Sequence, residues 1–517
     1  MTETIAQEAG ELFIVGFHGS KPSAEVREMI REYHVSGIIL FARNIESAGQ
    51  LAALTDALQT EARQAGYTEP LLIALDQENG VIRRIEAGVS LLPGAMALAA
   101  TGDPENAARS YAASAKELSE LGVNWSLAPD ADVNTNPDNP VIGVRSFGDN
   151  AQLVSQYVVQ AMNGLQQNGI AACLKHFPGH GNTSVDSHQD LPVLTQSLED
   201  LQGTELVPFE AGIKNGVNSV MIAHIQFPAV DRLLPASLSP VVISTLLRKR
   251  LAFNGVIVTD DLEMKAIADH YGTPAACVQA LKSGADLAMV SHVYETQKES
   301  IARVVAAINE GELVEADVAE KINRLRALRR RVGRWQNHFD AEKFSILVNN
   351  DNQLANELYQ HSVTVVQSPT QIIGPAPLVV TFDHQRYSLV VEHQKGDSAL
   401  FRAILEYYPE ASKLSVDLTT ATPLAELSEM KDQRPVIVGT SNVTGFNDIQ
   451  AQAVKMLIDR GHPVHVVAMR NPYDCRWFPA LASYIVAYEP TPQAMHWAAS
   501  ALAKKGNPSG RLPVVLP

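Results

Sequence analysis

Short apolar runs alternate with helical patterns along the first two-thirds of the chain, and this alternation limits the possible folds more than any other feature. Most of the runs are uniformly apolar, as strands buried on both faces of a sheet are. They are LFIVGF (12–17), GIILF (37–41), LLIALD (71–76), WSLAP (125–129), AACLKHF (171–177), SVMIAH (219–224), VIVTDD (256–261) and LAMVS (287–291). Helical patterns lie between them at 24–33, 47–66, 106–122, 152–169 and 241–252. Strand and helix repeated about eight times predict an α/β fold with a (β/α)₈ barrel. The alternative, a doubly wound open sheet, does not usually need so many repeats.

A second, smaller domain is expected after the barrel. Residues 318–336 are the most basic stretch, but their apolar residues recur at helical spacing, which predicts a solvated amphipathic helix rather than a binding patch. Strand-like runs follow at 362–367, 378–382, 413–418, 435–440, 463–469 and 483–489. They predict an α/β sandwich, and its lack of a G-x-G-x-x-G or P-loop motif argues against a nucleotide cofactor. We place the barrel at 1–336, the linker at 337–358 and the sandwich domain at 359–517.

The charge balance and the cysteines limit partners and location. The 517 residues include 41 Lys+Arg and 57 Asp+Glu, a net charge of −16 that argues against nucleic acid or an anionic membrane as the main ligand. Cys173, Cys277 and Cys475 show no C-x-x-C spacing, so neither a disulfide framework nor a thiolate zinc site is predicted. The N-terminal stretch lacks a signal-peptide pattern, and no run approaches about 18 apolar residues. We therefore expect a soluble protein in a reducing cytoplasm.

Ionisable groups stand at the ends of several predicted strands. In a barrel these carboxyl ends meet at one mouth, where active sites form, whereas a polar group inside a buried strand needs a partner. A single strand-end Asp is often only the N-cap of the next helix. Several convergent groups are harder to explain in that way: they are Asp76, Lys175, His176, His224, Asp260 and Asp261.

The densest group of such residues is the loop from Lys175 to Pro192, which holds three histidines and Asp186 among Gly, Pro, Ser and Asn residues. Two functional readings compete. Imidazoles and a carboxylate are a ligand set for zinc or another divalent ion. Alternatively, Asp186 can hydrogen-bond His188, fix its tautomer and raise its basicity for general acid/base catalysis. The structural alternative is a loop whose histidines only bond backbone groups.

The same loop resembles a known family. Its run K-H-F-P-G-H-G-x-x-x-x-D-S-H-x-x-x-P is similar to the signature of glycoside hydrolase family 3, in its β-N-acetylglucosaminidase branch. Other stretches agree with the resemblance: ILFARN (39–44), ALDQENG (74–80), NPVIGVRSFG (139–148), VIVTDDLEM (256–264), RNPYD (470–474) and GRLPVVLP (510–517). The likeness covers nearly the whole chain. It implies a (β/α)₈ barrel followed by an α/β domain.

The resemblance also implies residue roles. Asp260 matches the catalytic nucleophile, a choice over Asp261 that spacing alone does not make. His188 matches the general acid/base, with Asp186 as its dyad partner. Residues that match those holding the hydroxyls of the terminal sugar are Lys175, His176, Asp76, Arg84 and Arg145. The chain departs from the family at Asn79-Gly80-Val81, where Gly-Gly-Arg is usual, and at Asn182, where acidic residues are common.

The activity implied by this resemblance is that of a retaining exo-β-N-acetylglucosaminidase. Its substrate would be an oligosaccharide or glycopeptide derived from chitin or peptidoglycan, and it would need no metal or other cofactor. A carboxylate nucleophile and a proton donor are what a retaining glycosidase requires. The alternatives are a β-N-acetylglucosaminide phosphorylase or broader β-glycosidase of the same family, and a non-catalytic sugar-binding module on an enzyme fold.

Overall fold

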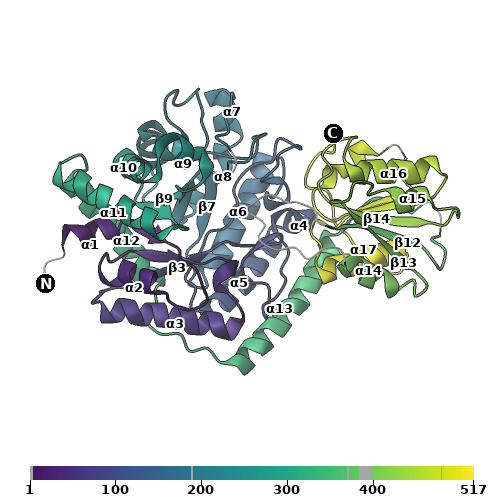
Figure 1. Ribbon diagram of the computed structural model, residues 1–517, viewed down its shortest axis with the longest axis horizontal. Helices are drawn as coiled ribbons and strands as arrows, with labels where there is room; N and C mark the ends of the chain where they lie inside the picture. The colour runs from purple at the N-terminus through teal and green to yellow at the C-terminus, as the bar shows by residue number, and fades with distance from the viewer. Residues whose placement is uncertain (1–3, 188–189, 370–371, 384–397, 479) are drawn as a thin grey trace.

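The computed structural model describes residues 4–187, 190–369, 372–383, 398–478 and 480–517. Figure 1 shows two bodies side by side, a barrel formed by the first two-thirds of the chain and a sheet domain formed by the last third. Within the described ranges, no helix is long and apolar enough to cross a membrane.

Eight parallel strands build the barrel, in the order β6-β3-β2-β1-β10-β9-β8-β7. Isolated parallel bridges from Trp125 to Ala171 and from Asp130 to Lys175 join the two ends of this order, so the sheet closes on itself. Each predicted apolar run contains one strand, and the predicted (β/α)₈ barrel is confirmed. The strands are β1 (Phe13–Val15), β2 (Gly37–Ile39), β3 (Leu72–Leu75), β6 (Trp125–Ser126), β7 (Cys173–Phe177), β8 (Ser219–Ile222), β9 (Val256–Asp261) and β10 (Leu287–Val290).

Helices surround this sheet and begin where the sequence supplies capping side chains. Ser23, Ser47 and Asn150 each accept a hydrogen bond from the backbone N–H three residues later, which satisfies a donor that the helix start leaves open. The main covering helices are α1 (Ile5–Gly10), α2 (Ala24–Arg31), α3 (Ala48–Gln64), α5 (Glu105–Glu120), α6 (Ala151–Gln166), α8 (Leu206–Lys214), the π-helix η4 (Val241–Arg250), α10 (Thr273–Ser283), α11 (Tyr294–Asn309) and α12 (Glu315–Val332). Shorter ones lie on the connecting loops: α4 (Ala95–Ala100), η2 (Gly143–Arg145), α7 (Leu198–Gly203), η3 (Ala236–Leu238) and α9 (Lys265–Tyr271).

A long helix, α13 (Ala341–Ser362), occupies most of the stretch predicted to be a linker. Asp340 caps its start by accepting from the N–H groups of Glu342 and Lys343, both at 3.1 Å. The helix packs against α4 and α5 of the barrel and against α17 (Pro492–Leu502) of the second domain. Figure 1 shows it running between the two bodies. The connection is therefore a packed helix.

The second domain is a six-stranded sheet between helices. Its strand order is β11-β16-β15-β14-β12-β13, parallel except for the edge strand β11. Alternate residues of β14 point to opposite faces, Val436 and Val438 toward one core and Ile437 toward the other. Its elements are β11 (Thr364–Gln367), β12 (Leu378–Asp383), α14 (Ser398–Leu405), β13 (Ser412–Asp417), α15 (Ala425–Ser428), β14 (Val436–Thr440), α16 (Ile449–Asp459), β15 (Val464–Ala468), η5 (Pro472–Trp477) and β16 (Ser483–Val486).

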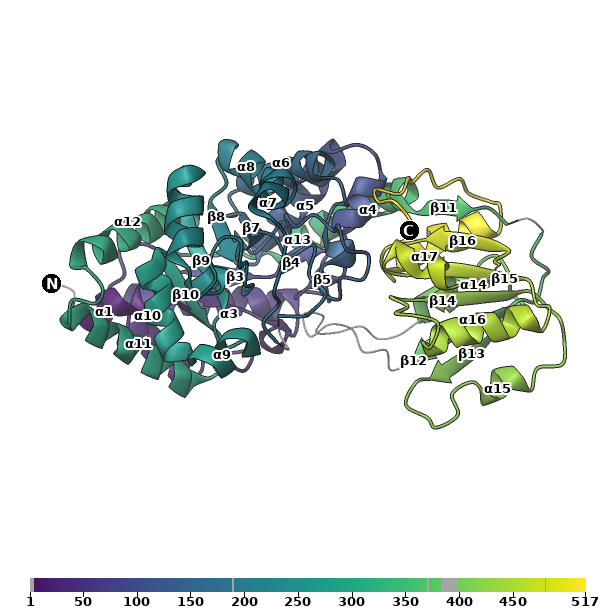
Figure 2. The ribbon, with the colours of Figure 1, turned by 90° about the horizontal axis from the view of Figure 1, so that it is seen from above.

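The two domains share buried contacts. In the α4 helix of the barrel, Met96, Ala97 and Ala100 belong to one of the two apolar cores of the second domain. Beside them, the hairpin of β4 (Gln77–Asn79) and β5 (Ile82–Arg83) lies on the side of the barrel that faces the second domain, as Figure 2 shows. Arg83, which is partly buried, donates there to the buried Glu489 at 2.7 Å. The barrel loops near the hairpin are thus held in place by the second domain.

Candidate active site

A pocket opens at the carboxyl ends of the barrel strands, where the sequence places its ionisable groups. Six of the eight predicted site residues line this barrel pocket. They are Asp76, Arg84, Arg145, Lys175, His176 and Asp260. Asp76 and Asp260, which are 184 positions apart in the sequence, both line this pocket.

Asp76 follows β3 and forms ion pairs with two cationic side chains. Its carboxylate accepts from Lys175 Nζ at 2.7 Å and from Arg84 Nη2 at 3.1 Å. Burial would raise the pKa of Asp76, but the charges of Lys175 and Arg84 outweigh it and hold that pKa well below its usual range. Asp76 is therefore ionised at neutral pH, and the three groups present a fixed set of donors and acceptors to a ligand.

Arg84 reaches Asp76 because a tight hairpin follows β3. At its turn, Asn79 and Gly80 have φ values of 64° and 60°, the left-handed region that an Asn-Gly pair adopts in hairpins. A Cβ on Gly80 would lie 2.6 Å from the Cα of Gly94, so this position requires glycine. The departure Asn79-Gly80-Val81 from the family pattern is thus accommodated by a turn that keeps Arg84 in the barrel pocket.

Glu78, which sequence reasoning did not select, lies between Arg145 and Lys175. It accepts two hydrogen bonds from Arg145, at 2.9 Å from Nε and 2.8 Å from Nη2, and lies 2.6 Å from Lys175 Nζ. Burial would raise the pKa of Glu78, but Arg145 and Lys175 lower it to about 2. Burial alone would lower the pKa of Lys175. The charges of Asp76 and Glu78 outweigh this effect and raise that pKa above its usual value. Glu78 therefore keeps both cations charged and fixed.

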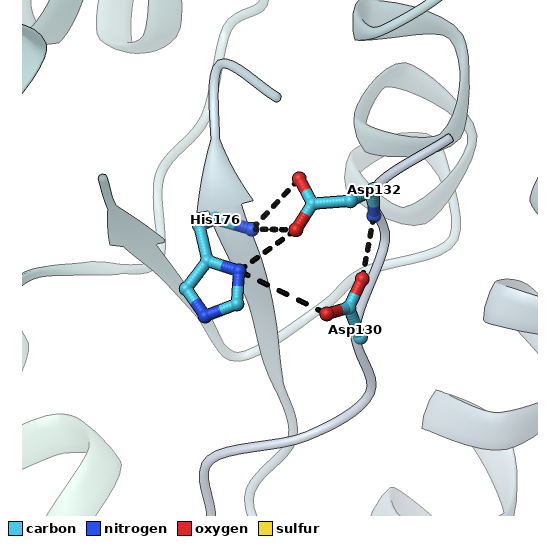
Figure 3. A group of neighbouring side chains, drawn as sticks. All are labelled: Asp130, Asp132 and His176. Atoms are coloured by element: carbon cyan, nitrogen blue, oxygen red, sulfur yellow. Dashed lines mark hydrogen bonds and ion pairs between the residues drawn. The ribbon is translucent and has the colours of Figure 1, made fainter. Parts of the chain in front are cut away.

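His176 is held from behind by Asp132, as Figure 3 shows. Its Nδ1 lies 2.7 Å from Asp132 Oδ2, and the backbone N–H groups of His176 and His180 donate to the same carboxylate. On the other side, Arg145 Nη2 lies 3.3 Å from His176 Nε2. Since a guanidinium only donates, Nε2 accepts and Nδ1 carries the proton toward Asp132. The orientation and tautomer of His176 are therefore fixed.

Asp130, Asp132 and His176 are the one group with metal-ligand spacing in the described part of the chain. Asp132 already accepts from the N–H groups of His176 and His180, and Arg145 Nη2 lies 3.8 Å from Asp130. Burial and the Asp132 charge raise the pKa of Asp130 well above its usual value; burial acts the same way on Asp132, but His176 and His180 lower its pKa. The proton on Asp130 and the positive charge of Arg145 thus compensate the charges of the two carboxyl groups. This arrangement fits a pair that holds His176 in place better than a site for a divalent cation.

Asp260 and Asp261 both line the barrel pocket at the end of β9, but they differ in their contacts. Asp261 accepts from Ser291 Oγ and from the backbone N–H of Glu263, and it lies 3.2 Å from His292 Nε2. Burial raises the pKa of Asp261 to about 6. Asp260 is partly exposed, and one of its oxygens accepts from the Asp261 N–H at 2.8 Å. The carboxylate of Asp261 is thus engaged with β10 and its loop.

His224 is not part of the barrel pocket, although the sequence places it among the strand-end groups. It is fully buried, and its Nε2 donates to the backbone carbonyl of Asp261 at 2.9 Å. Its Nδ1 therefore accepts from Ser237 at 2.8 Å. His224 supports the end of β9, the strand that carries Asp260.

The loop after β7 contributes residues to the walls of two cavities. Asp186 is buried and lines a second cavity, between barrel and second domain, whereas its neighbour Ser187 lines the barrel pocket. His180 bonds Thr183 at 2.7 Å and Ser187 at 3.1 Å, and burial together with nearby His176 lowers its pKa to about 4. His180 is thus a neutral support of the loop. His188 lies outside the described residues, so its assignment as acid/base stays a prediction.

The barrel pocket also has an apolar side. Met221, Met264 and Met289 line it together with Phe41 and Leu127. A lining that combines charged donors and acceptors with apolar groups suits a ligand that carries several hydroxyls and also exposes C–H surface, as a sugar ring does. A carboxylate near the ligand and a fixed imidazole add the chemistry for attack and for proton transfer or hydrogen bonding.

The chain is similar to known glycosidases over most of its length. The profile described as "Glycosyl hydrolase family 3 N terminal domain" matches residues 4–328. A solved glycoside hydrolase family 3 beta-N-acetylglucosaminidase from Paenibacillus sp. str. FPU-7 shares 36% identity over 100% of this chain and 99% of its own, with a TM-score of 0.92. Beta-hexosaminidase A of Pseudoalteromonas piscicida is 28% identical over 90% of this chain and 84% of its own. The beta-hexosaminidase of Stenotrophomonas maltophilia (strain R551-3) is 36% identical over 54% and 83%.

Proposed function

The chain belongs to glycoside hydrolase family 3, as its loop motif indicated, and from this premise we propose that it is a retaining exo-β-N-acetylglucosaminidase. The substrate would be chitin- or peptidoglycan-derived oligosaccharide with a terminal GlcNAc. One observation carries the proposal: Asp260 shares the barrel pocket with the fixed cluster of Asp76, Arg84, Lys175 and His176. Names of beta-hexosaminidase and beta-N-acetylglucosaminidase relatives support the choice of sugar.

Asp260 would act as the nucleophile. In a retaining reaction a carboxylate attacks the anomeric carbon as the bond to the leaving oxygen breaks, and a covalent glycosyl-enzyme results. Asp261 is a weaker candidate because Ser291 and His292 bind its carboxylate and burial favours its protonated form, with a pKa of about 6. The partial exposure of Asp260 supports its contact with substrate.

His188 would give a proton to the leaving oxygen and later remove one from the water that hydrolyses the intermediate. Asp186 would hold its imidazole. The geometry of the described neighbours supports this assignment, because Ser187, next to His188 in sequence, lines the barrel pocket. The glycosidic bond would therefore be cleaved near Ser187, and the leaving group would exit on that side.

The buried charges would hold the terminal sugar. Lys175, Arg84 and Asp76 would bond its hydroxyls, and orientation of a bound ring lowers the barrier more than simple affinity does. Because Glu78 and Asp132 hold Arg145, Lys175 and His176 in place before binding, little ordering is left to occur when the sugar enters.

A panel of 4-nitrophenyl β-glycosides tests the proposal. We expect release of 4-nitrophenol from the GlcNAc glycoside at a kcat/KM at least about tenfold above that for the glucose, xylose and GalNAc glycosides. The panel is run with and without phosphate, and the products are identified. If GlcNAc-1-phosphate is formed, the reaction is phosphorolysis rather than hydrolysis. Tight GlcNAc binding without turnover of any glycoside would indicate a non-catalytic sugar-binding module.

We also propose that the protein works in the cytoplasm. Its three cysteines are free thiols, with Cys173 and Cys277 buried and Cys475 partly buried, and free thiols persist in reducing compartments. Cell fractionation with an antibody against the protein tests this, and recovery from the medium or an oxidising compartment would contradict it.

A further inference from the structure

A buried carboxylate of the second domain lies behind the floor of the barrel pocket. Glu489 comes shortly after β16, is 2% exposed, and is not among the described residues that line the barrel pocket. A small cavity behind the floor is lined by Glu489 together with Glu78 and Arg145. The mechanism proposed above gives Glu489 no role, although it lies this close to the groups that hold the sugar-binding cations.

Glu489 bonds two segments of the barrel at once. Its Oε2 accepts from Arg83 Nη2 at 2.7 Å, and its Oε1 accepts from the backbone N–H of Gly94 at 2.9 Å. Arg83 is the last residue of the hairpin of β4 and β5, and Gly94 directly precedes α4. Each oxygen of a carboxylate is an acceptor, so one side chain can hold both donors. Glu489 therefore ties the hairpin to the segment that leads into α4.

The same two segments touch at a pair of glycines. A Cβ on Gly94 would lie 2.8 Å from the Cα of Gly80, which is at the hairpin turn, so a side chain there would push the segments apart. The Gly80 N–H donates to the carbonyl of Leu92 at 3.1 Å, and Arg83 Nε donates to the Gly80 carbonyl. The hairpin turn is thus held by close backbone packing and by the Glu489 carboxylate together.

The two strands of the hairpin differ in what else fixes them. In β4, the side chain of Glu78 binds Arg145 and Lys175. In β5, Arg83 is bound by Glu489, and the next residue is Arg84, which lines the barrel pocket. A shift of the turn would therefore be passed on mainly to Arg84. A misplacement of about 1 Å can lower a rate about 100-fold even when its cause lies away from the reacting atoms.

Glu489 depends on the hairpin in return. Burial raises the pKa of Glu489, and the charge of Arg83 and the N–H of Gly94 offset part of this rise. A buried carboxylate that lost these donors would be costly. The ion pair and the hydrogen bond thus stabilise the domain contact and the hairpin as one unit.

We propose that Glu489 is a positioning residue of the active site, which fixes the hairpin and thereby the place of Arg84 in the barrel pocket. The proposal rests on the proposed function and deepens it, because it makes the second domain necessary for the geometry of the sugar-binding cluster. Glu489 acts through Arg83 and the turn, without contact with the substrate.

Glu489→Gln tests this role because an amide has one acceptor oxygen and cannot hold both Arg83 and Gly94. We expect kcat/KM for 4-nitrophenyl β-GlcNAc to fall about tenfold or more, with an unchanged far-UV circular dichroism spectrum. Arg83→Gln removes the same ion pair from the barrel side and should give a similar loss. A loss of less than about twofold in either folded variant would overturn the proposal.

Met96→Ala is the matched control, because it weakens the contact between the same two domains without removing a bond of the hairpin. Met96 lies on α4, is fully buried and packs in a core of the second domain. The variant should have a lower Tm because a cavity forms, yet its kcat/KM should change less than about twofold. If kcat/KM fell equally in Met96→Ala and Glu489→Gln, Glu489 would only support the domain interface and the proposal would be wrong.

A double-mutant cycle tests whether Glu489 acts through Arg84. Once Arg84→Ala has removed the group that the hairpin places in the pocket, Glu489→Gln should lower kcat/KM by less than about threefold more. A structural role alone would give the same fold loss with and without Arg84. Full multiplication of the two losses would therefore overturn the proposal.

Hydrogen–deuterium exchange separates a failure of this proposal from a failure of the proposed function, because it needs no turnover. We expect peptides that cover residues 77–85 to exchange faster in Glu489→Gln than in the wild type and in Met96→Ala. Unchanged exchange in these peptides would overturn the positioning role. Absence of turnover of 4-nitrophenyl β-GlcNAc by the wild type would instead refute the proposed function alone.

Discussion

The floor of the barrel pocket differs from the wall of the interdomain cleft, the second cavity that lies between the barrel and the second domain, in how its polar groups are bonded. In the pocket, Glu78 and Asp76 bind Lys175 and Arg145 in a buried network of ion pairs. Beside the cleft, the buried Oγ of Ser441 has no hydrogen-bond partner within the described structure. The polar groups of the pocket floor are therefore satisfied by the protein itself, whereas one buried hydroxyl beside the cleft is not.

The fixed groups of the pocket suit a terminal sugar that must react, because catalysis depends on orientation within a fraction of an ångström. We therefore expect substitutions in the pocket to cause large effects on the turnover of every substrate, and substitutions beside the cleft to cause smaller ones.

The largest effect should follow loss of the nucleophile. Asp260→Ala is expected to lower kcat for 4-nitrophenyl β-GlcNAc by about 10⁴-fold or more, because no carboxylate then reaches the anomeric carbon. Asp261→Asn is the matched control one residue away and should lower kcat less, since Asp261 binds Ser291 and His292. Steady-state kinetics measures both, and a larger loss in the Asp261 variant would reverse the assignment.

The next effect concerns the stability of the pocket floor. Glu78→Gln removes the charge that Arg145 and Lys175 share, and loss of one partner of a buried ion pair costs about 3 to 5 kcal/mol. Urea denaturation measures the free energy of unfolding. Glu357→Gln in the exposed pair with Arg109 is the control, expected to change it by less than about 1 kcal/mol. Equal changes in the two variants would show that the floor is not preorganised.

Activity should depend on the hydrogen bond by which Asp132 holds His176. Asp132→Asn removes the charged acceptor of the Nδ1 proton, and we expect kcat/KM to fall about 10- to 100-fold, with a displaced pH profile. Asp130→Asn is the control: because its raised pKa keeps Asp130 protonated, the neutral amide resembles it and should cost less. If both variants behaved alike, the two carboxylates would not have separate roles.

The smallest expected effect is on how the free energy of unfolding depends on pH, which should differ between the barrel pocket and the interdomain cleft. Burial raises the pKa of Asp474 in the cleft from 3.8 to about 7, so the folded state holds more protons and stability falls as pH rises from about 4 to about 7. The pKa of Glu78 is lowered from 4.5 to about 2, so its contribution is present above about 4.5 and lost as pH falls toward 2. Asp474→Asn should flatten the decline in the free energy of unfolding toward neutral pH, as measured by urea titrations at several pH values. An unchanged slope would contradict the burial of an uncharged Asp474.

Much of this architecture is predictable from sequence, because buried parallel strands leave long apolar runs and the ends of those runs mark the barrel mouth. The same rule applied after WSLAP finds Asp130 and Asp132, which sequence reasoning passed over. Glu78 carries a weaker signal, since it lies in a hairpin that is too short to show a pattern. The packing of helix α13 and the cavity between the domains depend on how two domains pack, which no local pattern in the sequence specifies.

Covalent trapping tests the central assignment most directly. A 5-fluoro-N-acetylglucosaminyl fluoride slows breakdown of a glycosyl-enzyme because its ring fluorine destabilises the transition state, so the intermediate accumulates. Digestion and fragmentation by mass spectrometry then locate the sugar. The account predicts one sugar on Asp260 of the wild type and none on Asp260→Ala. A label on Asp261, or turnover with an inverted product and no label, would contradict it.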